Sequence, residues 1–223
     1  MDGVHTPSQL NVVSNAVARH RGPRVGRTRR TCRRRPSRLP ISPQQAALAT
    51  DVRDLVEAAG LDHPILVGFD WGNRAAGAAA YLWPEMAGGL VAIGGYALYD
   101  PPLGIEPAPP DVERRFWYAH YFCTDRGRRA LEGADRDLFA LLWREWPPNS
   151  DRSSKQLNMM VESATSPDFA AVVTHAYRHR MAGAAGDTRL ELLERRLAGL
   201  PTISVQTVVV EGTANALDPP MPP

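Results

Sequence analysis

The chain has 223 residues, of which 43% are hydrophobic and 22% charged, and its formal net charge is +2. This length accommodates one α/β domain, or one domain with an inserted lid. No apolar run reaches the roughly 18 residues that a membrane span needs, so we predict no membrane span. Its two cysteines, Cys32 and Cys123, form no disulfide framework, which makes a reduced, cytoplasmic setting the expectation.

The charge is distributed unevenly along the chain. Ten arginines lie between Arg19 and Arg38, and no acidic residue occurs between Asp2 and Asp51. Without these ten, 16 basic residues stand against 23 acidic residues from Asp51 onward, a net charge of −7. Residues 1–41 therefore form a basic arm. We expect this arm to be disordered, because it is rich in arginine and proline and its basic part lacks hydrophobic periodicity.

Four explanations of the basic arm stay open. A nucleic-acid-binding tail would place the arginines on phosphates, but the arm has no aromatic residue for base stacking. A mitochondrial transit peptide is also rich in arginine, but residues 27–38 form a block rather than an amphipathic stripe, and the first 18 residues contain no Lys or Arg. A shifted reading frame or misplaced start is the explanation that we favour. A disordered extension without function has nearly the same consequences.

The first predicted elements form a strand–helix–strand unit. Residues 44–59 carry apolar residues at helical spacing and are followed by Gly60, which predicts a helix. A short apolar strand is predicted over 64–67, a second helix over 72–83 and a second strand over 90–93. Elements in this order predict a parallel sheet.

Beyond these elements the sequence becomes mostly helical. Residues 101–110 contain five prolines and predict a linker, and a strand is predicted again over 203–210. Between them we predict helices over 111–122, 128–146, 154–164, 167–181 and 190–197. The fold class is therefore α/β, with a core of residues 42–100 and 199–223 and an inserted helical cap of residues 101–198. Further strands and helices would be expected beyond this core, so we predict a truncated domain.

Asp70 lies at the centre of the motif Gly68-Phe-Asp-Trp-Gly72, which has the G-x-[nucleophile]-x-G spacing of a nucleophile elbow. In such an elbow a strand turns sharply into a helix, and glycines avoid side-chain clashes where the two cross. The helix N-terminus stabilises negative charge beside the nucleophile. An Asp nucleophile would attack through its carboxylate and form an ester. The alternative, a surface turn with a helix-capping Asp, is less favoured beside a strand and a helix.

The order of elements and the motif resemble the α/β-hydrolases with an Asp nucleophile, chiefly epoxide hydrolases and haloalkane dehalogenases. Residues 66–76, LVGFDWGNRAA, are similar to the family's LVGHDWGGRAA, and the resemblance extends over about residues 42–220. It implies that Asp70 is the nucleophile and that the backbone N–H of Trp71 is an oxyanion donor. The sequence departs from the family pattern where a His is replaced by Phe69 and a Gly by Asn73.

The cap region is similar to that of epoxide hydrolases. Residues 116–122, FWYAHYF, match a family segment F-x-Y-x-x-Y-F, and Tyr177-Arg178 matches a Tyr-Arg pair on a later cap helix. The resemblance implies that Tyr118 and Tyr177 donate hydrogen bonds to the epoxide oxygen. A phenol with a pKa of about 10 is a suitable acid for the alkoxide that ring opening produces. Tyr121 is interpreted as a packing residue.

The resemblance also implies a His base oriented by an acid, and the chain supplies these incompletely. The acid position falls on Asn215, which cannot stabilise an imidazolium, and Asp218 is a substitute acid. No His follows His179, and His175 and His179 are weak candidates for the base. The family's H-G-x-P turn, which supplies a second oxyanion donor, is not recognisable either. We therefore expect the chain as given to be inactive or to stall at the ester on Asp70.

The function predicted from the sequence is hydrolysis of a small apolar epoxide to a diol through an ester on Asp70, without a cofactor or a metal. We expect no membrane and no nucleic acid as partners. The alternatives are a haloalkane dehalogenase-like hydrolase, in which the Trp71 ring N–H would hold the halide, and a non-catalytic remnant. A nucleic-acid-binding protein that uses the basic arm is a further alternative.

Overall fold

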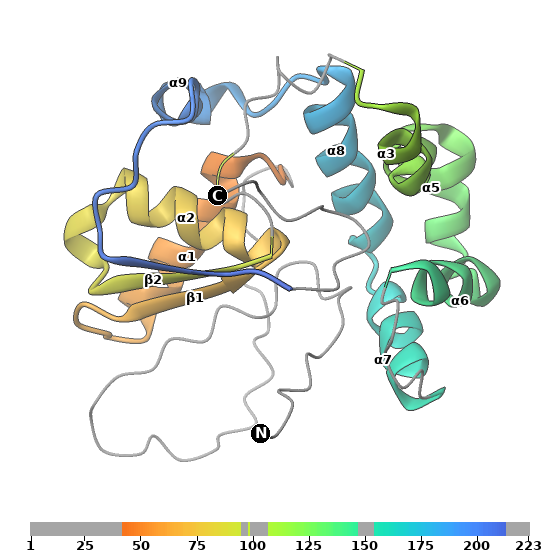
Figure 1. Cartoon of the computed structure of the whole chain (residues 1–223), viewed down its shortest axis with the longest axis horizontal. Coiled ribbons are helices and arrows are strands. Elements are labelled where there is room, and N and C mark those ends of the chain that lie inside the picture. The colour runs from red at the N-terminus through yellow and green to blue at the C-terminus, as the bar shows by residue number, and fades with distance from the viewer. Residues whose placement is uncertain (1–41, 95–97, 99–106, 147–153, 213–223) are drawn as a thin grey trace.

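The computed structural model describes residues 42–94, 98, 107–146 and 154–212. A three-stranded sheet lies under two helices, and a group of further helices lies beyond the carboxyl ends of the strands (Figure 1). This arrangement has the predicted character of a small parallel sheet followed by a mostly helical region. None of the described helices combines the length and the hydropathy that crossing a membrane requires.

The sheet has the order β1-β2-β3 and is parallel throughout. Strand β1, Ile65–Phe69, pairs with β2, Gly89–Ile93, over its whole length. Strand β3, Thr207–Val210, pairs with β2 from the Leu90–Thr207 pair to the Ile93–Val210 pair. The predicted strands are confirmed, although the last one begins at Thr207 rather than at residue 203.

Helices α1, Gln45–Ala58, and α2, Trp71–Leu82, pack against each other, and α2 covers β1 and β2. Helix α9, Glu191–Leu197, packs on both helices, preceded by a 3₁₀ turn over Thr188–Leu190. The alanines of α2 allow this close approach, because they add no side chain beyond Cβ. Together these elements bury one hydrophobic cluster, which includes Leu66, Leu82, Leu90 and Leu197. Another short 3₁₀ helix, Pro84–Met86, follows α2.

The remaining helices form a second hydrophobic cluster that includes Phe122, Phe139, Leu142 and Trp143. These helices are α3, Pro110–Arg115; α4, Trp117–Cys123; α5, Asp125–Glu132; α6, Arg136–Glu145; α7, Ser154–Ala164; and α8, Phe169–Ala182. Two predicted helices, 111–122 and 128–146, are each broken in two. The second break lies at Ala134, whose φ of 46° is unfavourable in a helix, and the side chain of Asp135 caps α6.

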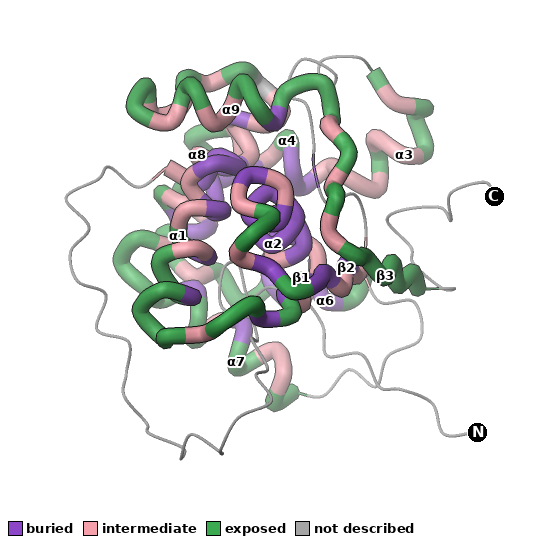
Figure 2. Tube along the Cα trace, turned by 90° about the vertical axis from the view of Figure 1, so that its left-hand side faces the viewer, coloured by how far each residue is buried: buried purple, intermediate pink, exposed green. Residues whose placement is uncertain are grey.

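The two faces of the sheet differ in burial. Leu66 and Leu90 are buried beneath α2, as expected for a face covered by a helix. On the other face, Ile65, Val208 and Val210 are 49%, 55% and 43% exposed. Figure 2 shows β3 exposed along its length. Parallel sheets are normally covered on both faces, so the described residues leave an apolar sheet surface open.

Candidate active site

Asp70 lies between the end of β1 and the start of α2, in a backbone conformation that L-residues rarely adopt. Its φ is 49° and its ψ is −115°, outside the left-handed helical region as well as the β and α regions. Its N–H donates to the carbonyl of Ile93 at 3.1 Å, and its own carbonyl accepts from the N–H of Arg74 at 3.1 Å. The elbow is therefore anchored on β2 and on the first turn of α2. Strain of this kind concentrates at functional sites.

The two glycines beside Asp70 have different roles. A Cβ atom on Gly68 would lie 2.3 Å from the carbonyl oxygen of Gly72 and 2.5 Å from the Cα of Asn73. A Cβ atom on Gly72 would meet none of the described atoms within 4 Å. The steric requirement inferred from the motif thus holds for Gly68 but not for Gly72.

Two cap tyrosines and the residue after Asp70 come together through their rings. The rings of Tyr118 on α4 and Tyr177 on α8 meet edge to face, with centroids 6.0 Å apart. The ring of Tyr177 meets that of Trp71 in the same way, at 5.8 Å. The rings that contact Tyr121 include those of Trp117 and Phe122, as expected for a packing residue. A continuous aromatic contact therefore connects the cap to the elbow.

The hydroxyl of Tyr177 lies in an electrostatic environment shaped by the elbow. Burial raises its pKa to about 12, and the negative charge of Asp70 contributes to this rise. A hydrogen bond from the side chain of Trp71 and the positive charges of Arg180 and Arg74 act in the opposite direction. The ring contact with Trp71, the residue after Asp70, places the Tyr177 side chain next to the elbow.

Arg178 holds the helix that carries Tyr177. Its Nε donates to the carbonyl of Cys123 at 2.7 Å, and its Nη2 lies 2.8 Å from Oδ1 of Asp125. These bonds attach α8 to the end of α4 and the start of α5. The arginine of the Tyr-Arg pair therefore fixes the neighbouring tyrosine by anchoring its helix.

Solved structures of known proteins share this fold. A candidate epoxide hydrolase from Klebsiella pneumoniae superposes with a TM-score of 0.78 and 32% sequence identity, over 83% of this chain and 61% of that chain. The fold is that of an α/β-hydrolase. The epoxide hydrolase of Bacillus megaterium, solved with an inhibitor, matches with a TM-score of 0.51 and 16% identity, over 79% of this chain and 61% of that one. These neighbours confirm the resemblance to the epoxide hydrolase type of this fold.

The likeness has limits in extent and in specificity. The chain spans about three fifths of the length of the Klebsiella protein. A candidate acyltransferase from Salmonella enterica also matches, with a TM-score of 0.56 and 11% identity, over 77% of this chain and 64% of that one. At such identities the likeness concerns the fold alone, since one fold hosts many reactions. No family model matches the sequence, and a search of curated proteins finds no match.

The described histidines contact groups other than Asp70. His63 is exposed beside Asp62 at the opposite end of β1, and His120 lies 2.9 Å from a carboxylate oxygen of Glu113. The remaining pair, His175 and His179, stack on each other on α8 with centroids 6.2 Å apart. The pKa of His179 is lowered by burial and by His175. These contacts give no support to a histidine base beside Asp70.

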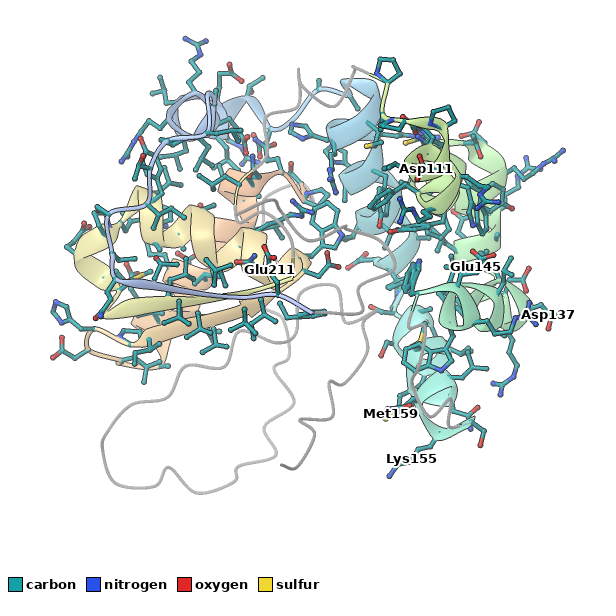
Figure 3. All side chains as sticks on the ribbon, in the orientation of Figure 1. Asp111, Asp137, Glu145, Lys155, Met159 and Glu211 are labelled. Atoms are coloured by element: carbon teal, nitrogen blue, oxygen red, sulfur yellow. The ribbon has the colours of Figure 1, made fainter. Side chains whose placement is uncertain are left out.

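The predicted acids Asn215 and Asp218 lie outside the described residues, as does the basic arm of residues 1–41. Among the described residues, the acid that follows the carboxyl end of β3 is Glu211, whose side chain is exposed (Figure 3). Arg74 is a further residue near Trp71, one for which the sequence predicted no role. Its guanidinium is buried and lies 5.5 Å from the centre of the Trp71 ring. Its position in the first turn of α2, directly after the motif, was the available signal.

Proposed function

We propose that this α/β-hydrolase opens an epoxide by attack of the Asp70 carboxylate on a ring carbon. The new bond joins an Asp70 oxygen to that carbon while the carbon–oxygen bond of the ring breaks. The released alkoxide takes a proton from a phenol, which leaves a hydroxyalkyl ester on Asp70. The observation that supports this proposal is that the ring of Tyr177 contacts that of Trp71, the residue after Asp70, as well as that of Tyr118.

The phenol of Tyr177 suits the role of acid in this step. With a pKa of about 12 it stays protonated at neutral pH, so it has a proton to donate when the alkoxide forms. An alkoxide is more basic than this phenolate, which makes the proton transfer favourable. Tyr118, whose ring contacts that of Tyr177, is the proposed second donor to the same oxygen.

The second step, hydrolysis of the ester, is supported less completely. The backbone N–H of Trp71 is the proposed oxyanion donor, at the N-terminus of α2, where peptide dipoles favour negative charge. This step also requires a base that activates water, and the described histidines lie beside Asp62, beside Glu113 or in the stacked pair on α8. We therefore propose that the 223-residue chain forms the ester but releases diol slowly or not at all.

Dehalogenation is the competing reaction for an Asp nucleophile in this fold. It would need a ring N–H to hold the halide, and the Trp71 indole was the candidate for this role. The ring of this indole meets the ring of Tyr177 edge to face, with centroids 5.8 Å apart. A phenol beside the elbow favours epoxide opening over release of a halide.

The experiment that tests the proposal is intact-protein mass spectrometry after incubation with a small reactive epoxide. We expect one adduct of epoxide mass on the wild type, none on Asp70→Asn, and slow formation on Tyr177→Phe. Tyr121→Phe is the matched control, because it removes a phenol of the same cap from outside the site and should alkylate at the wild-type rate. Adduct formation on Asp70→Asn at the wild-type rate would remove Asp70 from the mechanism.

A further inference from the structure

We infer that His175 and His179 of α8 form a binding site for one divalent metal ion of the zinc and nickel type. This site does not depend on the proposed function. The two histidines are one helical turn apart, so their side chains lie on the same face of α8. Their rings are nearly parallel, at 14°, with centroids 6.2 Å apart. Two histidines at this spacing on one helix hold Zn²⁺ in the HExxH motif of metalloproteases.

Each of the two rings has a buried nitrogen without a hydrogen bond. The Nδ1 atoms of His175 and His179 are shielded from solvent and have no hydrogen-bond partner among the described residues. His179 as a whole is 9% exposed. A buried polar atom without a partner is rare in folded proteins and lowers their stability. A metal ion bound between the two rings would give both nitrogens a partner at once.

The separation of the two rings is compatible with one shared ion. A Zn–N bond is about 2.0–2.1 Å long and an imidazole centre lies about 1.1 Å behind its nitrogen, so each ring centre lies roughly 3.2 Å from the metal. Two such centres are roughly 5.2 Å apart at a tetrahedral angle and at most roughly 6.4 Å apart. The observed 6.2 Å is below this upper limit. An approach of about 1 Å, through rotation of the two side chains, would give the tetrahedral arrangement.

The chemistry of the ligands selects the class of metal. Imidazole nitrogen suits Zn²⁺, Ni²⁺ and Cu²⁺, whereas Mg²⁺ and Ca²⁺ are bound through oxygen. Among the described residues no third His, Cys, Asp or Glu joins the pair, so water would fill the remaining coordination positions. Burial and the neighbouring His175 lower the pKa of His179, which keeps this ring neutral and able to bind a metal at neutral pH.

The position of the pair connects metal binding to the turn of α8 that carries Tyr177. Tyr177 lies between the two histidines in the sequence, two residues from each. An ion that joins His175 to His179 would therefore hold this turn in its helical conformation. Because the two rings are held on one face only when α8 is folded, the ion should also stabilise the folded chain.

Titration of the metal-free protein with Zn²⁺ and with Ni²⁺, followed by calorimetry and by thermal unfolding, tests the site. We expect each metal to bind and to raise the melting temperature, and Mg²⁺ to do neither. His175→Gln and His179→Gln should each weaken binding at least roughly tenfold, because even the loss of an outer partner of a ligand costs this much. The matched control is His120→Gln, which removes a half-exposed histidine beside Glu113 and should bind like the wild type. Wild-type affinity in both His175→Gln and His179→Gln would overturn the inference.

A second measurement locates the metal in the wild type, so it does not depend on the folding of a variant at a buried position. Paramagnetic Ni²⁺ broadens the NMR signals of nuclei close to it. Small additions of Ni²⁺ should broaden the imidazole signals of His175 and His179 before those of His63 and His120, which lie beside other groups. His63→Gln and His120→Gln assign the latter two signals by their loss. Broadening of His63 or His120 first, or no binding of either metal by the wild type, would refute the site.

Discussion

Gly68 is the position at which one added methyl group tests the elbow. In Gly68→Ala the new Cβ would lie 2.3 Å from the carbonyl oxygen of Gly72 and 2.5 Å from the Cα of Asn73. Both are backbone atoms, so no side-chain rotation relieves the contact, and β1 and α2 must move apart. Overpacking of this kind costs about 1–3 kcal/mol, and because backbone is involved we expect a loss of about 3 kcal/mol in the free energy of unfolding.

Gly72→Ala is the matched control on the other side of Asp70. The added Cβ meets none of the described atoms within 4 Å, and the residue lies in the first turn of α2. Alanine is more favourable than glycine inside a helix by about 0.5–1 kcal/mol. We therefore expect this variant to be as stable as the wild type or slightly more stable, and to differ from Gly68→Ala by about 3 kcal/mol.

Equilibrium unfolding in urea, followed by circular dichroism, measures this difference. For a urea dependence of about 2 kcal/mol per molar, the two alanine variants should differ in midpoint by about 1.5 M. Gly68→Ala should also fail to form the epoxide adduct, because separation of β1 and α2 displaces Asp70, which lies between them. Equal midpoints for the two variants would show that β1 and α2 are not in close contact at this crossing, and the steric argument would fail.

Three further predictions concern titration and surface. The raised pKa of Tyr177 means that the folded state keeps a proton that the unfolded state releases. Its contribution to stability is complete below pH 10, and roughly 3 kcal/mol is lost as the pH rises from 10 to 12. Tyr177→Phe should lack this loss in alkaline urea titrations. Burial likewise raises the pKa of Glu194, whose carboxylate accepts from the N–H of Ala46. Because the folded state binds this proton more tightly than the unfolded state, acidification should stabilise the wild type. Glu194→Gln should abolish this increase in stability in thermal melts across pH 4–7. Val209 is 64% exposed on β3, and a lysine there should oppose association through this strand. Val209→Lys should therefore reduce light scattering at high protein concentration and change the free energy of unfolding by less than about 0.5 kcal/mol. Unchanged scattering would show that this strand does not drive association.

The parallel sheet and the elbow were predictable because local sequence determines them. The apolar run of β1, the glycine at its crossing and the alanines of α2 are neighbours in the chain, so their pattern is visible without any long-range information. The strained conformation of Asp70 also agrees with the motif. The resemblance added the two cap tyrosines, which local patterns would have assigned to packing.

The interruptions of the cap helices were not predictable in the same way. The break at Ala134 requires a positive φ at a residue that favours helices, and the cap formed by Asp135 was not recognised as a start signal. The ring contact between Trp71 and Tyr177 joins residues from distant parts of the sequence, on elements whose relative placement depends on tertiary packing. Sequence periodicity carries no information on such a pair.

The two halves of the proposed reaction depend on different parts of the fold. Attack by Asp70 requires β1, β2, α2 and α8. The N–H of Asp70 donates to the carbonyl of Ile93 on β2, and the side chain of Trp71 packs on α8. Arg178 holds α8 by donating to the carbonyl of Cys123 at the end of α4. For water activation, the family resemblance points to the chain after β3, a strand whose valines are exposed in the described structure. A chain with the first set of contacts can form an ester even where the second is incomplete. Ester formation and diol release should therefore be separable by mutation as well as by measurement, with variants near β3 affecting release alone.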